Sequence, residues 1–179
     1  DIKVNNSIVT AHCPNTGSMK GLLDKDNTVF LSKNDDPKRK LKFTLEILKS
    51  KNNLIGINTH LANKLVLEGL KNNSFLEFKN LENIQPEIFY NKETRFDFLV
   101  SKKNKKSFIE VKNVTLIRDN KNSEFPDAIT TRGSKHIKTL IEASKKGYQC
   151  YVLFLVQISN CKYFKIAKDI DKEYYENYK

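Results

Sequence analysis

The stretch RFDFLVSKKNKKSFIEVKNVTL, residues 95–116, decides the fold. Apolar and polar side chains alternate over residues 95–100, and a second apolar segment follows at residues 108–116. Between them lies the polar turn Ser101–Lys106, which holds four lysines. Because a period of two is typical of strands, this stretch predicts two strands joined by a lysine-rich hairpin.

Three charged side chains of this hairpin form a pattern that indicates chemistry. Asp97 lies in the first strand, Glu110 follows in the second, and Lys112 is two residues further on. Alternate residues of a strand share a face, so Glu110 and Lys112 point the same way, and the hairpin brings Asp97 beside Glu110. Two carboxylates offer oxygen ligands to Mg²⁺ or Mn²⁺, and a neighbouring lysine can position the attacking water. The spacing D-x12-E-x-K is that of the PD-(D/E)xK nucleases, although a cross-strand ion pair between Asp97 and Lys112 on a solvated face gives the same spacing.

The segments on either side of the hairpin predict two helices and one more strand. Helical spacing of apolar residues runs from Thr59, the predicted N-cap, to Leu70, and a second helix is predicted to stop at Gly147. Residues 148–158 form a nearly continuous apolar run, which predicts a central strand buried on both faces. Strand, helix, strand in that order predicts an α/β sheet with a right-handed crossover. A third acidic ligand is expected from the first helix, where Glu68 is the candidate and an ordinary solvent-facing glutamate is the alternative.

A group of candidate phosphate-binding residues lies in TTRGSKH, residues 130–136. The threonines can cap the second helix, and Asp127 is a further candidate for a cap at the helix entry. The first helical turn presents three basic side chains beside free backbone N–H groups, where phosphate binds well: Arg132, Lys135 and His136. The hairpin lysines are expected to hold a flanking strand of nucleic acid by charge: Lys102, Lys103, Lys105 and Lys106.

The composition fits a protein that binds a polyanion. The 179 residues include 32 Lys+Arg against 21 Asp+Glu, a formal net charge of +11. Nucleic acid is the commonest polyanion in cytoplasm, so it is the expected partner. The alternative is an AT-rich codon bias, because the chain contains 28 Lys and 20 Asn but only 4 Arg.

Other features of the sequence exclude several protein classes. No apolar run approaches the roughly 20 residues that a membrane span needs, so we expect no membrane partner. Three scattered cysteines fit neither a disulfide framework nor a zinc site and indicate a reducing cytoplasm. The chain opens at Asp1 without an export signal, which indicates a trimmed start. The oligomeric state, monomer or homo-oligomer, stays open.

Six stretches of the chain resemble one family. They are AHCPNTGSM at 11–19, PKRKL at 37–41, NTHLANKLV at 58–66, RFDFLV at 95–100, IEVKNVTL at 109–116 and FPDAITTRGSKHI at 125–137. Together they resemble the sugar fermentation stimulation protein family, SfsA. The resemblance implies an OB-like β-barrel followed by a PD-(D/E)xK restriction-endonuclease-like α/β domain, a mixed α+β fold. The short strands expected within residues 1–56 agree with the barrel, so the domains are predicted at 1–56 and 57–179.

Three hypotheses about function remain. The first is a metal-dependent nuclease in which Asp97 and Glu110 hold the metal, Lys112 positions water and Glu68 assists. The second is a non-catalytic DNA-binding regulator, since the resemblance also implies DNA binding, which favours DNA over RNA as the partner, and a proposed regulatory role in sugar, particularly maltose, metabolism. The third is a structural or protein-interaction module whose lysines reflect genome composition. The intact set of two acids and a lysine favours catalysis.

Overall fold

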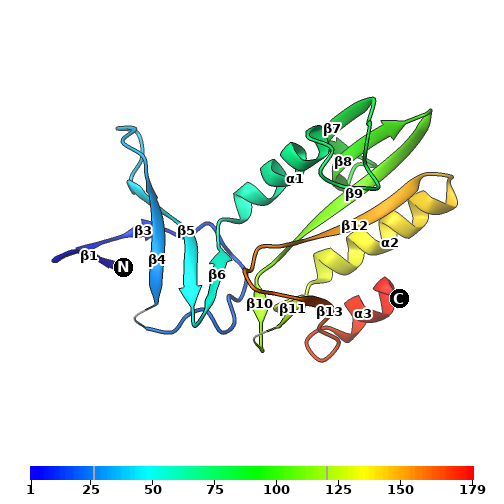
Figure 1. The fold of residues 1–179 in the computed structure, drawn as a ribbon. Coiled ribbons are helices and arrows are strands. Elements are labelled where there is room, and N and C mark those ends of the chain that lie inside the picture. The colour runs from blue at the N-terminus through cyan, green and yellow to red at the C-terminus, as the bar shows by residue number, and fades with distance from the viewer. Residues whose placement is uncertain (26, 120) are drawn as a thin grey trace. The chain divides into compact units, whose positions relative to one another are not determined.

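The computed structural model describes residues 1–25, 27–119 and 121–179 (Figure 1). Contacts between residues divide the chain into two compact units, and neither is one continuous stretch. The first unit contains Asp1–His60, Val114–Ala128 and Val156–Ile166. The second contains Leu61–Asn113, Ile129–Leu155 and Ala167–Lys179.

The first unit is built from short strands in three sheets. A two-stranded sheet pairs β1 (Ile2–Val4) with β2 (Ser7–Val9), and a second sheet contains β3 (Ala11–His12), β4 (Thr28–Lys33), β5 (Phe43–Ser50) and β6 (Asn53–Gly56). The third contains β10 (Leu116–Ile117), β11 (Asn122–Phe125) and β13 (Tyr163–Ile166). Apolar side chains from these segments share one core, which includes Leu22, Leu48, Ile55, Ile57 and Ile158.

The pairing in the first unit differs from the prediction in one respect. Small antiparallel strands were expected, but β3 pairs with β5 in parallel. Parallel neighbours need a long connection, and residues 13–42 supply it. The prediction of purely antiparallel pairing was therefore wrong, because alternation of apolar residues shows a strand without showing its partner.

The second unit is organised around a four-stranded sheet. Its order is β12 (Gln149–Val156), β9 (Lys105–Val114), β8 (Arg95–Lys102) and β7 (Asn83–Phe89). The predicted hairpin is present, since Lys102 pairs with Lys105 across a two-residue turn. Lys103 and Asn104 both have positive φ, 49° and 63°, as a type I′ turn requires.

Two helices cover opposite faces of this sheet (Figure 1). The helix α1 (Ala62–Lys71) packs Val66 and Leu70 against a core that includes Phe98 and Ile109. The helix α2 (Thr131–Lys145) packs Leu140 against the other face, beside Phe96 and Phe108. The buried rings and aliphatic side chains hold β8 and β9 between two apolar layers, so charged groups on these strands are shielded from water.

The start of α2 is tied to the last helix, α3 (Lys172–Tyr178). Thr130 is the N-cap of α2, as predicted, because its Oγ1 accepts a hydrogen bond of 3.1 Å from Gly133 N. Asp171 caps α3 by accepting 2.8 Å from Tyr174 N, and its other oxygen accepts 2.8 Å from Thr130 N. One carboxylate thus fixes both helix starts.

The strand predicted at residues 148–158 lies at the edge of the sheet, so its prediction as a central strand was wrong. Its side chains pack into both apolar layers, Tyr151 and Leu153 into one, Cys150 and Val152 into the other. A strand covered on both faces has a continuous apolar sequence whether or not its outer edge is paired. The sequence pattern therefore could not distinguish an edge from a centre.

Two predicted helix caps were also wrong. Thr59 lies in a 3₁₀ turn (Thr59–Leu61) before α1, and its hydroxyl donates 2.9 Å to the Pro14 carbonyl. Asp127 does not cap α2 but accepts hydrogen bonds from Ser18 Oγ (3.0 Å) and Met19 N (3.3 Å). Both side chains thus hold the turn at residues 14–19 within the first unit. Among the described residues, no helix is long and apolar enough to cross a membrane.

Candidate functional site

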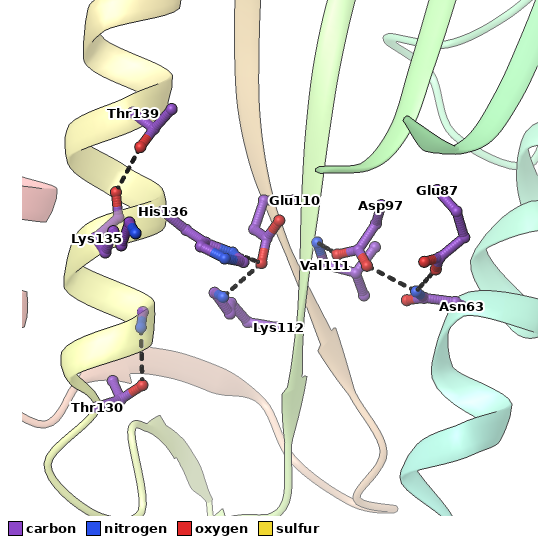
Figure 2. Close-up of polar contacts among 11 residues, drawn as sticks. Asn63, Glu87, Asp97, Glu110, Val111, Lys112, Thr130, Lys135, His136 and Thr139 are labelled. Carbon is purple, nitrogen blue, oxygen red and sulfur yellow. Dashed lines mark hydrogen bonds and ion pairs between the residues drawn. The ribbon is translucent and has the colours of Figure 1, made fainter. Parts of the chain in front are cut away.

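Glu110 is a buried carboxylate in which one oxygen has hydrogen-bond partners and the other has none among the described residues. It is 4% exposed. Its Oε1 accepts a hydrogen bond of 2.7 Å from Lys112 Nζ and faces His136 Nδ1 (Figure 2). Its Oε2 is also buried and has no hydrogen-bond partner among the described residues. An anionic oxygen away from water without a donor is unfavourable, so this atom calls for a bound cation or donor.

The neighbours of Glu110 keep it ionised. Burial by itself would raise the pKa of Glu110, but the hydrogen bond from His136 and the charge of Lys112 outweigh burial and hold that pKa below its ordinary value. The side chain is therefore a carboxylate at neutral pH, the form that binds a metal ion.

Asp97 lies where the pairing of β8 with β9 stops. The last paired residues are Phe98 and Ile109, so the next backbone N–H of β9 that faces β8, that of Val111, has no strand partner there. Asp97 Oδ2 accepts that hydrogen bond at 2.7 Å, and Oδ1 accepts one of 2.7 Å from Asn63 Nδ2 of α1. The Asp97 side chain thus replaces a missing ladder bond and connects the strand to the helix.

The charge of Glu110 affects the ionisation of Asp97. Burial raises the pKa of Asp97, the negative charge of Glu110 raises it further, and the hydrogen bonds from Val111 and Asn63 oppose both effects. Figure 2 shows Glu110 on the side of β9 that faces α2, together with Lys112 and His136, and Asp97 on the side of Asn63. A carboxylate whose ionised form is disfavoured by burial and by a neighbouring negative charge is a setting in which a cation is stabilising.

The α1 side chain that contacts Asp97 is Asn63 and not Glu68, the predicted residue. The sequence prediction missed Asn63. Besides Asp97, its Nδ2 also lies 3.4 Å from Glu87 Oε1. Glu68 is exposed and sits five residues further along the helix, about 140° around its axis. Among the described residues no hydrogen bond or ion pair joins its side chain to either carboxylate, and no group of three or more His, Cys, Asp or Glu side chains is placed to hold a metal ion. The participation of Glu68 stays a prediction that the geometry does not favour.

The residues predicted to grip phosphate separate into two environments. Arg132 and Lys135 are exposed on the first turns of α2, and Lys135 Nζ pairs with Glu93 at 2.8 Å. His136 is only 6% exposed, and its ring faces Glu110 rather than solvent. His136 therefore belongs with the buried carboxylate, which the sequence spacing alone did not show.

The hairpin lysines lie far from the two acidic residues Asp97 and Glu110. The turn precedes the first residue of β9, whereas Glu110 lies in the middle of that strand, and the five residues from Lys105 to Glu110 span roughly 17 Å in an extended strand. Three of the four are exposed, and Lys102 is partly buried. The structure thus places these cations as a separate basic tip.

Comparison with known proteins identifies the family. Residues 60–179 match the family model described as "Sugar fermentation stimulation protein RE domain", and residues 1–57 match "SfsA N-terminal OB domain". The chain belongs to the SfsA family. This confirms the resemblance seen in the sequence, and with it the predicted N-terminal OB-like barrel followed by a mixed α/β domain.

Individual SfsA relatives cover most of the chain. The sugar fermentation stimulation protein homolog of Pelagibacter ubique (strain HTCC1062) is 68% identical over 99% of this chain and 77% of its own length. The homolog of Geotalea uraniireducens (strain Rf4) is 43% identical over 93% of this chain and 72% of its own length. The solved structure of Pyrococcus furiosus SfsA in complex with Ca²⁺ has a TM-score of 0.87 and 22% identity, covering 98% of this chain and 74% of that one. At that identity the likeness supports the fold.

Proposed function

We propose that this SfsA chain is a metal-dependent nuclease that hydrolyses phosphodiesters of nucleic acid. The observation that carries the proposal is Glu110, a buried and ionised carboxylate fixed at Oε1 by Lys112 and His136 but without a donor at Oε2. Structural burial alone would favour an apolar side chain at this position, because a buried charge without full pairing destabilises the fold. A site that retains such a charge is a candidate for function.

The residues fit a divalent cation with oxygen ligands. Glu110 Oε2 and the carboxylate of Asp97 are the ligand types that Mg²⁺ and Mn²⁺ prefer, and two protein carboxylates are enough for Mg²⁺, which keeps several waters. A bound ion would polarise the phosphoryl oxygen and lower the pKa of a bound water. The solved relative from Pyrococcus furiosus was obtained in complex with Ca²⁺, another cation that takes oxygen ligands. This supports an oxygen-ligand site without assigning its residues.

Lys112 and His136 have separate tasks in this proposal. Lys112 Nζ is largely buried and lies 2.7 Å from Glu110 Oε1, where a positive charge can orient the attacking water and neutralise charge that develops on the phosphate. His136 acts through Glu110, because its ring holds Oε1 and leaves Oε2 as the oxygen without a partner. Asn63 has the corresponding positioning task for Asp97.

A second candidate function is a non-catalytic DNA-binding regulator. It is favoured by the absence of a third acidic side chain beside Asp97 and Glu110 in the described part of the chain. In that case Asp97 and Glu110 would have no catalytic role, and the exposed lysine and arginine side chains alone would bind DNA. The third hypothesis, a structural module, is supported only by the lysine- and asparagine-rich composition.

The test is cleavage of labelled DNA and RNA with Mg²⁺, Mn²⁺ or EDTA. The proposal predicts metal-dependent cleavage that Glu110→Gln and Lys112→Ala each abolish, while retention of DNA at low salt persists. Cleavage that both variants retain would overturn the assignment. Retention without cleavage in either metal would favour the regulator.

A further inference from the structure

A hollow of about 390 Å³ lies beside the acidic site of the second unit. One wall is the connection between β7 and β8, and the other is the start of α2. Its lining residues are Phe89, Glu93, Arg95, Thr131, Arg132, Lys135 and His136. No functional role was predicted from the sequence for Phe89 or Arg95.

The hollow contains arginines, although most basic residues of the chain are lysines. The sequence has 28 Lys and 4 Arg, and two of the four, Arg95 and Arg132, line this hollow. Codon bias accounts for abundant lysine but not for arginine at these positions. Arginine differs from lysine because its planar guanidinium binds phosphate through two hydrogen bonds and stacks on flat rings.

Phe89 supplies a flat ring open to solvent. It is 67% exposed at the end of β7, and the guanidinium of Arg95 lies 5.8 Å from its ring centroid. An exposed phenylalanine beside an arginine is the kind of platform on which nucleic-acid bases stack, and stacking requires no particular base.

The acidic residues near the hollow form ion pairs that an incoming phosphate can replace. Arg95 pairs with Glu87, and Lys135 with Glu93, both at 2.8 Å, and all four side chains are about half exposed or more. Exposed ion pairs contribute little and are readily exchanged. Arg132 is exposed and has no ion pair among the described residues, so it can meet an incoming phosphate directly.

His136 connects the hollow to the acidic site. His136 is one of the residues that line the hollow, and its Nδ1 faces Glu110 Oε1. A nucleotide in the hollow therefore lies one side chain away from the candidate catalytic carboxylate.

We propose that this hollow binds an unpaired nucleotide of single-stranded nucleic acid, with the base on Phe89 and its backbone phosphates on Arg132 and Arg95. This inference rests on the proposed function and names its substrate class. A base inside a duplex has both faces covered by its stacked neighbours, so Phe89 can stack only on an unpaired base. Single strands and single-stranded ends or flaps share this chemistry.

Binding of fluorescein-labelled oligonucleotides in EDTA tests the proposal without any cleavage. The wild-type chain is expected to bind a single-stranded 12-mer at least tenfold more tightly than a blunt duplex of the same length. Phe89→Ala and Phe89→Leu should each weaken single-strand binding about tenfold, whereas Phe89→Tyr should retain it, because only an aromatic ring stacks. Arg132→Ala should weaken binding and reduce the salt slope by about 0.7.

Matched controls remove the same groups elsewhere. Tyr163→Ala removes an aromatic side chain that is 63% exposed in the first unit, and Lys145→Ala removes one charge from a later turn of α2. Both should bind within twofold of wild type. Equal binding of Phe89→Leu and Phe89→Tyr, or tighter binding of the blunt duplex, would overturn the inference. Because the assay contains no metal, loss of the proposed catalysis would leave these results unchanged.

Discussion

Asn63 Nδ2 donates a hydrogen bond of 2.7 Å to Asp97 Oδ1, and this bond links helix α1 to the strand that carries the first acidic residue. Asn63 lies on the same helix face as Val66 and Leu70, which are buried, so the bond is anchored by the core. The position of Asp97 therefore depends on the packing of α1 as well as on the strand.

Asn63→Ala should raise the pKa of Asp97, because it removes a donor that favours the ionised form. The Asp97 carboxyl can be followed by ¹³C NMR titration, and the free energy of unfolding should fall by about 1 kcal/mol from the lost hydrogen bond. Lys64→Ala, an exposed neighbour on the same helix, is the control. An unchanged Asp97 pKa in Asn63→Ala would contradict this assignment.

Asp97→Asn should lower the free energy of unfolding at neutral pH by about 1 kcal/mol, because asparagine keeps one accepting oxygen but replaces the other by an NH₂ donor, so either Val111 N or Asn63 Nδ2 loses its acceptor. The raised folded pKa means that protonation favours the folded state, so the wild type is most stable relative to the variant below the ordinary pKa of an aspartate. The part of that advantage that comes from protonation is lost as pH rises through the folded pKa. Urea unfolding at pH 3 and pH 7 would test the sign, and a stability difference between wild type and variant that is larger at pH 7 than at pH 3 would refute it.

Glu110→Gln should destabilise the chain at pH 7 by about 3 kcal/mol, because it leaves the largely buried Lys112 without its anion. The pKa of Glu110 is lowered in the folded state, so the pH dependence of its contribution to stability is opposite in sign to that of Asp97. The stabilisation from ionised Glu110 is present above the ordinary glutamate pKa and is lost as pH falls through the folded pKa. The difference from wild type should therefore narrow in acid, as measured by chemical unfolding. Glu68→Gln, on the exposed side of α1, should change stability by less than about 0.5 kcal/mol.

The hairpin tip should contribute to retention of nucleic acid but not to chemistry. Combined Lys103→Ala, Lys105→Ala and Lys106→Ala substitutions should weaken binding at low salt and flatten its salt dependence, since each phosphate contact contributes about 0.7 to 0.9 to the slope. The cleavage rate at saturating substrate should stay within about twofold, because the tip is roughly 17 Å from Glu110 along the strand. A cleavage rate that falls by the same factor as the affinity for nucleic acid would contradict this prediction and place the hairpin tip at the reacting phosphate.

Much of this arrangement is readable from the sequence because it depends on local spacing. Residues 95–116 alternate with a period of two around a polar turn, and the turn is a two-residue hairpin as predicted. Glu110 and Lys112 are two residues apart on one strand, which is enough to place them on one face, and their 2.7 Å contact follows.

What the sequence could not show depends on contacts between distant segments. Asn63 is a polar residue within an apolar helical stripe, a signal that was available, but only packing shows that it meets Asp97. His136 is basic beside Arg132 and Lys135, yet the helix rotates it inward towards Glu110. The edge position of β12 is set by strand order, which side-chain periodicity does not encode.

Anomalous diffraction from crystals soaked in Mn²⁺ tests the central claim most directly. The proposal predicts a peak within about 2.3 Å of Glu110 Oε2 and of one Asp97 carboxylate oxygen. The same soak of Glu110→Gln crystals should show no such peak. Wild-type crystals with ordered Glu110 and Asp97 side chains and no peak between them at high Mn²⁺ would contradict the metal site and, with it, the proposed nuclease.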